Sequence, residues 1–410
     1  MKPPSPPSLP LIGHIPGFQR DVLGLLIRSV KEYGDHLRFK LGPYPVYVFN
    51  HPDDVLHILK KNASNYDKET RSVRFLRDIS EESLLTSNGK EWQQRRQHLQ
   101  PAFHRKAIVG FETIMREEAE ELAESWAAQS EVEAADDLTT VTFSIVARSL
   151  FGADIPRETL TSLADPISRL LTEAFTRLGT LTGRKSRAFR ESKKQLDQVV
   201  GDVIAKRSQQ PETPDLFELI RSGNPDPNYV HHESISFLLA GHETTANALS
   251  WLLAFLAQHP EEQERCATDP EALERAFNES MRLAPPVWII ERHALGEDEV
   301  SGYRIPKGIS LAIPTYTMHR HPDFWEEPDR FNPDRFIDAD LPQAAFIPFG
   351  IGPRFCIGKE FAKMEARIIA GAILPRFRFR LASDETPQPQ AAITLRIKGG
   401  LRLKLEPRKA

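Results

Sequence analysis

The segment FIPFGIGPRFCIGKEFA, residues 346–362, sets a cysteine in a glycine-rich turn. Gly350 and Gly352 permit tight turns and the close approach of a flat ligand to Cys356. We expect a helix to begin near Cys356, because free N–H groups and the positive end of a helix dipole favour a thiolate. That thiolate would be a soft metal ligand. The alternative is a buried, inert cysteine, which is our interpretation of Cys266.

A second constellation pairs an acid with a base on one helix. Glu279 and Arg282 stand at i and i+3 in ERAFNESMRL, so both lie on the same helix face. A buried carboxylate–guanidinium pair is costly unless further bonds satisfy it, and Arg335 in FNPDRF is the candidate to complete it. Taken alone, such a pair is more often found on a surface.

Trp92 and Arg96 also share a helix face, four residues apart. An arginine and an indole N–H can both donate to a carboxylate of a bound ligand. The alternative is a solvated arginine beside a packed tryptophan. Arg95 lies on another face and is left out of this pair.

Together these segments resemble the cytochrome P-450 haem-thiolate family, over nearly the whole chain. The resemblance implies haem b held by the Cys356 thiolate, and a structural triad formed by Glu279, Arg282 and Arg335. It also assigns Trp92 to a haem propionate. The cysteine segment matches the family pattern F-x-x-G-x-R-x-C-x-G at Phe349, Gly350, Gly352, Arg354, Cys356 and Gly358. The arginines that the resemblance brings to the propionates are Arg96, Arg354 and Arg292.

The sequence FLLAGHETTANALSW resembles the oxygen-binding groove of that family. Ala240 and Gly241 are small enough for a planar ligand to approach closely, and glycine before hydroxyl residues can open a helix to water. We expect Thr244 to relay a proton toward dioxygen and Glu243 to connect that relay to solvent. His242 points elsewhere and is interpreted as structural. The histidines without metal-ligand spacing are His231, His232, His319 and His321.

The elements that must position these residues are mostly helical. The sequence predicts a mainly α fold with small β-sheets near both ends, in which a buried central helix from about Tyr229 to His259 lies over the haem. Pro260 ends that helix. The other expected elements are a proline-rich arm over 1–17, a hairpin over 37–49, a helix opening at Pro52, helices over 111–129, 139–151 and 192–207, an irregular stretch over 319–353 and a final helix from about 356 to 375.

Composition narrows the class of protein. The 410 residues carry a net charge of −4 and two cysteines, which gives no reason to expect nucleic-acid binding or a disulfide scaffold. No apolar stretch is long enough for a transmembrane anchor or a signal peptide. We therefore expect a single domain over 1–410, soluble and cytoplasmic, with no fused reductase. The basic run 184–194 is interpreted as a solvated helix start, with a mobile lid that meets membranes or greasy ligands as the alternative.

The segments expected to line a substrate cavity are mainly apolar, which predicts a hydrophobic substrate such as a fatty acid, terpenoid, carotenoid or steroid. They are the loop around 75–85, one face of the central helix and the segment 287–290. The individual candidates are Phe75, Leu76, Phe237, Thr245, Val287, Trp288, Ile289 and Ile290.

The electrons are expected from a separate partner, an acidic ferredoxin or flavodoxin with its reductase, supplied ultimately by NAD(P)H. Lys359, Lys363, Arg376 and Arg378 form the candidate docking patch near Cys356, with ordinary surface cations as the alternative.

The resemblance implies a monooxygenase that inserts one oxygen atom of O2 into a C–H bond. A peroxide-driven peroxygenase or an isomerase on the same haem is one alternative, which the Glu243–Thr244 pair disfavours. A non-catalytic haem sensor or a lipid carrier is the other.

Overall fold

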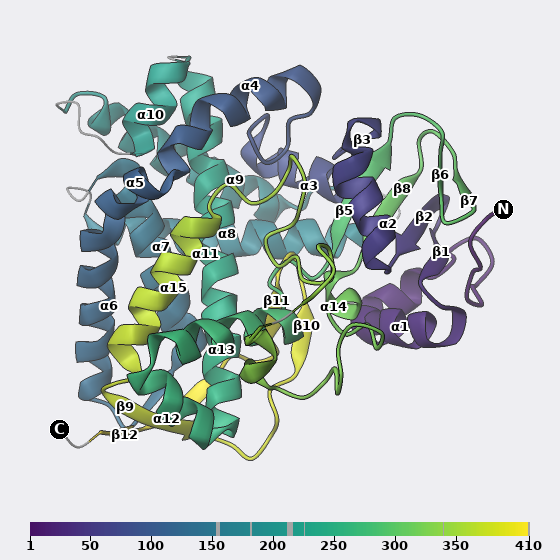
Figure 1. Cartoon of the computed structure of the whole chain (residues 1–410). Coiled ribbons are helices and arrows are strands. Elements are labelled where there is room, and N and C mark those ends of the chain that lie inside the picture. Colours follow the sequence, from purple (N-terminus) through teal and green to yellow (C-terminus); the bar gives the residue numbers. More distant parts are fainter. Residues whose placement is uncertain (153–155, 181–182, 211–215, 225, 339, 409–410) are drawn as a thin grey trace.

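A body of helices makes up one side of the molecule and a smaller region rich in strands the other (Figure 1). The expected class, mainly α with small sheets, is confirmed. The computed structural model describes residues 1–410 apart from 153–155, 181–182, 211–215, 225, 339 and 409–410.

The central helix α11 (Pro227–Gln258) runs through the helical body. The Asp226 carboxylate caps its first turn by accepting the Asn228 N–H, and Pro227 fits the first helical position. Pro260 cannot continue the helix and opens α12 instead. The prediction of a buried central helix is confirmed.

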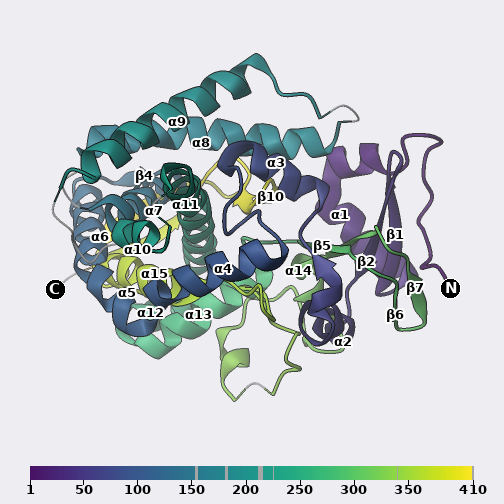
Figure 2. The ribbon, with the colours of Figure 1, turned by 90° about the horizontal axis from the view of Figure 1, so that it is seen from above.

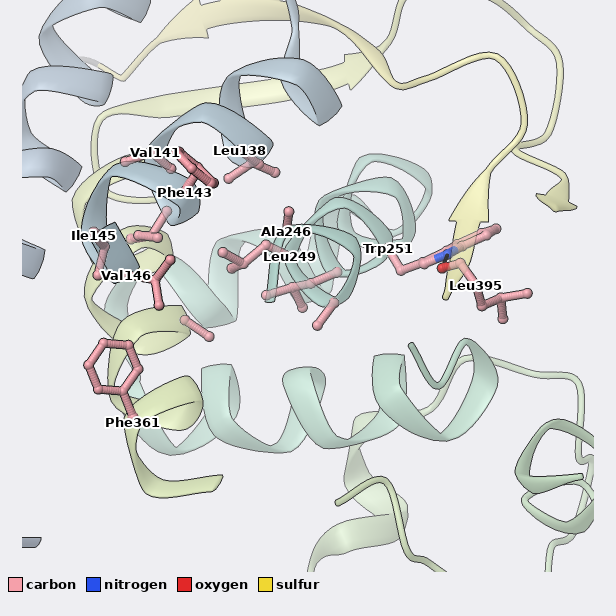
Figure 3. Close-up of a cluster of buried hydrophobic side chains, with 14 of the residues drawn as sticks. Leu138, Val141, Phe143, Ile145, Val146, Ala246, Leu249, Trp251, Phe361 and Leu395 are labelled. Carbon is pink, nitrogen blue, oxygen red and sulfur yellow. Dashed lines mark hydrogen bonds between the residues drawn. The ribbon is translucent and has the colours of Figure 1, made fainter. Parts of the chain in front are cut away.

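Apolar side chains of α7 (Ala134–Phe151) pack against α11 (Figure 3). Gly241 permits this approach, because a Cβ atom there would lie 2.6 Å from Val146 Cγ2. On the other side of α11, the Trp251 indole donates to the Leu395 carbonyl at 3.2 Å and ties the helix to β11. The central helix is therefore fixed on both flanks.

The helices α8 and α9 lie side by side along one flank of the body, at the upper edge of Figure 2. Several helices begin elsewhere than expected: α7 and α9 each start five residues earlier. Acidic Asp136 and Asp137 stabilise the first turn of α7, and the Ser186 hydroxyl caps α9 by accepting the Phe189 N–H. The helix bounds are α1 (Ile15–Tyr33), α2 (Pro52–Leu56), the π-helix η1 (His57–Lys61), η2 (Ala63–Asn65), α3 (Arg71–Ser80), α4 (Gly89–Leu99), η3 (Gln100–Phe103), α5 (Arg105–Ile108), η4 (Val109–Phe111), α6 (Glu112–Ala127), α8 (Arg157–Leu178), α9 (Arg187–Arg207), α10 (Leu216–Gly223), α12 (Pro260–Thr268), α13 (Pro270–Leu283), α14 (Thr315–Met318), η5 (Pro333–Phe336) and α15 (Lys359–Ile373).

The larger sheet joins strands from both ends of the chain in the order β1-β2-β8-β5-β3. The expected hairpin is formed by β1 and β2, and β2 pairs in parallel with β8, with Val48 opposite Ala312. The strand bounds are β1 (His36–Leu41), β2 (Tyr44–Phe49), β3 (Tyr66–Asp67), β4 (Glu131–Glu133), β5 (Ile290–Ala294), β6 (Asp298–Val300), β7 (Tyr303–Ile305), β8 (Ser310–Ile313), β9 (Phe377–Leu381), β10 (Pro389–Ala391), β11 (Leu395–Ile397) and β12 (Arg402–Pro407).

The proline-rich arm, expected to be extended over 1–17, is extended only over residues 1–8, where the Arg38 N–H donates to the Pro4 carbonyl at 2.8 Å. Residues 9–14 form turns closed by a Leu9–Gly13 bridge, and α1 begins within the expected arm at Ile15, because proline is tolerated in the first helical turn. The stretch 319–353 is irregular apart from the short η5. Among the residues that the structure describes, no helix combines the length and the apolar character needed to cross a membrane.

Candidate functional site

A cavity lies between α11, α4, the segment 81–88 and the loop that leads into α15. Its volume is about 210 Å³, somewhat below the usual range for cofactor and ligand sites. Most of the exposed lining is apolar. The residues that line it are Lys68, Leu84, Leu85, Trp92, Arg96, Phe103, Val146, Ser149, Leu216, Ser236, Phe237, Ala240, Gly241, Thr244, Thr245, Arg354, Phe355, Cys356, Ile357, Gly358, Phe361 and Ala362.

The loop that carries Cys356 is a series of turns joined by hydrogen bonds between its own backbone groups. The Cys356 N–H donates to the Phe349 carbonyl at 2.8 Å, and the Phe355 N–H to the Gly352 carbonyl at 3.1 Å. Gly352 has φ +76°, and a Cβ atom there would lie 1.8 Å from the Leu59 carbonyl oxygen. Only glycine fits at this contact, so the loop can pack closely against η1.

Cys356 itself opens into the cavity, three residues before α15 begins at Lys359. Although its side chain is accessible from the cavity, it lies deep in the protein, and burial raises the pKa of the thiol. The Gly358 N–H, Arg96 and Lys359 act in the opposite direction. The helix start therefore acts in the expected direction, but burial outweighs it in the protein alone. A coordinated metal would deprotonate the thiol.

Arg96 reaches the cavity from α4, beside the cysteine loop. It is 8% exposed, its Nη1 donates to the Phe355 carbonyl at 3.0 Å, and its guanidinium stacks on the Phe355 ring. Its Nη2 is buried and has no hydrogen-bond partner within the part of the chain that the structure describes. A buried donor without an acceptor is unfavourable, and a ligand carboxylate would satisfy it.

Trp92 and Arg354 meet at the same end of the cavity. The Arg354 guanidinium lies 4.0 Å above the Trp92 ring, and its Nη1 donates to the Ser87 carbonyl at 2.9 Å. Burial and the nearby positive charges lower the pKa of Arg354 to about 9. The structure thus brings the predicted Trp92, Arg96 and Arg354 to one cavity.

Lys68 joins this group and was missed by the sequence analysis. Its Nζ donates to the Leu85 carbonyl at 2.9 Å, and desolvation, then Arg354 and Arg292, lower the pKa of Lys68 to about 7. A lone lysine after β3 has no spacing pattern to reveal it. Arg292 is buried nearby on β5, where burial lowers its pKa to about 10, but it is not among the residues that line the cavity.

These residues fit a haem with an axial thiolate. The cavity has a soft ligand in Cys356, apolar walls, and cations gathered at one end, one with an orphaned buried donor. Mutually repelling buried cations lower one another's pKa values, and the carboxylates of a haem would relieve that repulsion. Among the described residues, no cluster of histidines, cysteines and carboxylates could bind a bare metal ion.

The α11 face toward the cavity carries Ala240, Gly241, Thr244 and Thr245. The Thr244 hydroxyl donates to the Ala240 carbonyl one turn back, at 2.8 Å. Its lone pairs thus remain free to accept from a group in the cavity, while its proton is held by the helix. The groove residues are in place, but Thr244 must rotate its hydroxyl to release a proton.

Glu243 does not line this cavity. Its side chain is buried on the side of α11 that faces β11, where Thr394 donates a hydrogen bond to it, and burial raises the pKa of its carboxyl. One of its oxygens, Oε2, has no partner among the described residues. Glu243 is thus a partly buried acid that lies outside the cavity wall.

A second buried acid, Glu365 on α15, was also missed. It is fully buried beside the Thr245 hydroxyl, and burial raises the pKa of its carboxyl well above the ordinary range. The signal available in the sequence was a single glutamate on an otherwise apolar helix face, which does not distinguish it from a surface acid.

The predicted triad residues are joined in the structure. Arg282 donates to both Glu279 oxygens, at 2.7 and 2.9 Å, and Arg335 Nε donates to Glu279 Oε1 at 3.0 Å. Arg282 also donates to the carbonyls of His319, Pro328 and Arg330. Glu279 and Arg282 are fully buried, so this network ties α13 to the irregular stretch before the cysteine loop.

Several predicted pocket residues lie outside the cavity wall. Phe237 and Thr245 line it, whereas Phe75 lies between the guanidinium groups of Arg71 and Arg177. Trp288 is buried, and its indole donates to the Ala392 carbonyl at 3.0 Å. Of the predicted loop around 75–85, Leu84 and Leu85 at its end line the cavity. The other candidates that the wall does not include are Leu76, Val287, Ile289 and Ile290.

The histidines hold structure, in line with their interpretation as non-ligands. His242 is buried, its Nδ1 lies 2.6 Å from the Leu238 carbonyl, and burial lowers its pKa to about 4. His319 Nε2 accepts the Ile347 N–H at 3.0 Å. His321 pairs with Asp35.

Comparison with known proteins agrees with this site. The family description "Cytochrome P-450" matches residues 3–404. Cyclooctatin synthase of Streptomyces melanosporofaciens is 28% identical over 98% of this chain and 95% of its own length. Pentalenene oxygenase of Streptomyces avermitilis is 26% identical over 98% of this chain and 97% of its own length. Cytokinin hydroxylase of Arabidopsis thaliana is 28% identical over 92% of this chain and 82% of its own length. A match of this extent, centred on a cysteine loop beneath a long helix, makes the chain a member of the cytochrome P-450 family, an oxidoreductase that incorporates molecular oxygen.

Proposed function

We propose that this chain, acting as a single haem domain, is a monooxygenase that inserts one atom of O2 into a C–H bond of a hydrophobic substrate. The observation that carries the proposal is that Cys356 and the small-residue face of α11 open into one largely apolar cavity. The relative named pentalenene oxygenase supports a terpenoid substrate for this chain.

In this proposal Cys356 binds the iron, and Arg96, Arg354, Trp92 and Lys68 hold the propionates. Bound haem supplies oxygen activation and electron transfer, with electrons from NAD(P)H through a partner. The remaining work is done by the chain. The apolar wall excludes water and orients the substrate.

Thr244 Oγ1 is proposed to pass a proton into the cavity when its hydroxyl rotates away from the Ala240 carbonyl. Burial raises the pKa of the Glu243 carboxyl, and we propose this carboxyl as the source of that proton. Since Glu243 lies behind α11, the transfer requires water or a side-chain movement between Glu243 and Thr244.

The reduced protein in carbon monoxide provides the first test. We expect a strongly red-shifted Soret band, lost in Cys356→Ser and kept in Cys266→Ser, because Cys266 is buried on α12 away from the cavity. A red-shifted band that survives Cys356→Ser would refute the assignment of the ligand.

Replacing Thr244 with alanine tests the reaction type. A monooxygenase should consume reductant and leak peroxide in this variant, whereas a peroxygenase should keep its peroxide-driven turnover. Thr140→Ala is the matched control, since Thr140 makes the same kind of bond to the Asp136 carbonyl on an exposed face of α7. Equal coupling in the wild type and in Thr244→Ala would exclude the proton role.

For the electron donor we propose an acidic ferredoxin or flavodoxin that docks around Lys359, near Cys356. The cations predicted with it are partly neutralised: Lys363 pairs with Glu274 at 2.6 Å and Arg378 with Glu264 at 2.9 Å. Arg376 likewise pairs with Glu120. Reversing Lys359 to glutamate should slow reduction more than the same change at Lys363. An unchanged, salt-insensitive rate in both variants would remove this docking site.

A further inference from the structure

The segment Glu81–Asn88, here called the roof loop, contributes Leu84 and Leu85 to the wall of the cavity. Nearly every residue along it is held by a charged side chain from elsewhere. Lys68 bonds the Leu85 carbonyl, Arg77 the Thr86 carbonyl at 2.8 Å, and Arg354 the Ser87 carbonyl. The roof loop therefore owes its position to side chains of other elements.

Leu84 is held by a residue of the central helix α11. Both carboxylate oxygens of Glu233 on α11 accept the Leu84 N–H, at 3.0 and 3.1 Å. Arg95 Nη1 donates to Glu233 Oε1 at 2.6 Å, and the Arg95 guanidinium stacks on the Tyr229 ring. Glu233 is fully buried, so these bonds are shielded from water.

A fully buried carboxylate on an apolar helix is costly, and it is tolerated only with several good bonds. Here the bonds go to the backbone of the roof loop and to a cation of α4. Glu233 also stands one helical turn before Phe237, so it lies on the α11 face that lines the cavity with Phe237. It thereby links Leu84 of the roof loop to the stretch of α11 that carries Phe237, and both of these residues line the cavity.

The anchors divide into two groups. Lys68 and Arg354 line the cavity among the cations where we place the propionates, whereas Glu233 bonds Leu84 and stands one helical turn before Phe237. Loss of Glu233 should therefore change how hydrophobic ligands fit without loosening the cofactor.

We propose that Glu233 is a positioning residue that holds the roof loop against α11 and thereby sets which hydrophobic ligands the cavity accepts. The role in ligand selection rests on the proposed function. The contact between Glu233 and the roof loop does not depend on it.

The test compares Glu233→Leu, an apolar replacement of similar volume, with Glu91→Gln. Glu91 is the matched control because it also pairs with Arg95, at 2.7 Å, but is half exposed and does not touch the loop. In Glu233→Leu we expect the Leu84 amide to exchange its hydrogen about 10- to 100-fold faster, the effect of losing a hydrogen bond to a charged group. Glu91→Gln should leave that rate unchanged.

Ligand selection is read from spectral titrations with imidazole and 4-phenylimidazole, two iron ligands that differ by a phenyl ring. We expect 4-phenylimidazole to bind at least about fourfold more weakly to Glu233→Leu, the effect of losing contact with one buried methylene, and imidazole to bind as before. Glu233→Gln keeps an oxygen acceptor and should restore slow exchange at Leu84.

Unchanged Leu84 exchange in Glu233→Leu, or equally fast exchange in Glu91→Gln or Glu233→Gln, would overturn the hold on the loop. Equal weakening of both ligands would overturn the role in selection. Should Glu233→Leu fail to fold, Glu233→Asp, which withdraws the carboxylate by one methylene, takes its place under the same criteria. A protein without any iron spectrum would refute the proposed function, and the exchange rates would still decide the loop contact.

Discussion

The buried network of Glu279 and Arg282 yields the sharpest prediction for stability. In Glu279→Gln an amide replaces the carboxylate between two arginines, and Arg282 keeps its charge in a site with no exposure to solvent. Breaking one partner of a buried ion pair costs about 3–5 kcal/mol. The variant retains the side-chain volume, so this cost is electrostatic and does not come from a cavity.

For 410 residues the unfolding entropy is about 0.9 kcal/mol/K, so the midpoint temperature of the haem-loaded protein should fall by about 3–6 °C. Differential scanning calorimetry measures this shift directly. The matched control is Glu297→Gln in the pair Arg304–Glu297, where both side chains are about two-thirds exposed. Exposed pairs contribute little, so the control should shift by less than about 1 °C. Equal shifts in the two variants would refute the argument from burial.

Three further predictions concern the loop, acid stability and the cofactor. Gly352→Ala should prevent a folded cysteine loop, because the added carbon meets the Leu59 carbonyl, whereas Gly308→Ala (φ +84°, open space) should only lower the melting temperature; soluble yield and calorimetry distinguish them. His242 is buried with its pKa lowered to about 4, so the unfolded state binds the extra proton between pH 6.5 and 4. Stability should therefore be lost as pH falls through that range, by up to about 3 kcal/mol, and urea titrations of His242→Gln should show a smaller loss. Arg96→Leu should release haem to apomyoglobin about 10- to 100-fold faster, and an unchanged release rate would exclude Arg96 as a propionate ligand.

The features that could be predicted from the sequence are those in which residues of given types stand at fixed intervals. The cysteine loop, the Glu279–Arg282 pair and Trp92 with Arg96 each follow from residue types at fixed intervals, and the central helix follows from its apolar length. The structure brings each of these together at the expected place.

Isolated charges were not predictable. Lys68, Glu233 and Glu365 are single residues whose burial depends on chain segments far away in sequence. The cavity wall was predicted only in part: the loop around 75–85 and the α11 face contribute to it, but Phe75 and Trp288 do not, because tertiary packing decides which apolar residue of an expected segment faces the cavity. The protonation of Cys356 also depends on burial, which a helix-start argument does not include.

The parallel pairing of β2 with β8 has a consequence for synthesis on the ribosome. Val48 and its partner Ala312 are 264 residues apart (312 − 48), so at about 5–20 residues per second β2 is made roughly 13–53 s before β8. During that interval the β1–β2 hairpin has an open edge and only marginal stability. The nascent chain thus carries an unpaired strand for most of its translation, and a chaperone that shields such edges should raise the yield of this protein more than it speeds its final refolding.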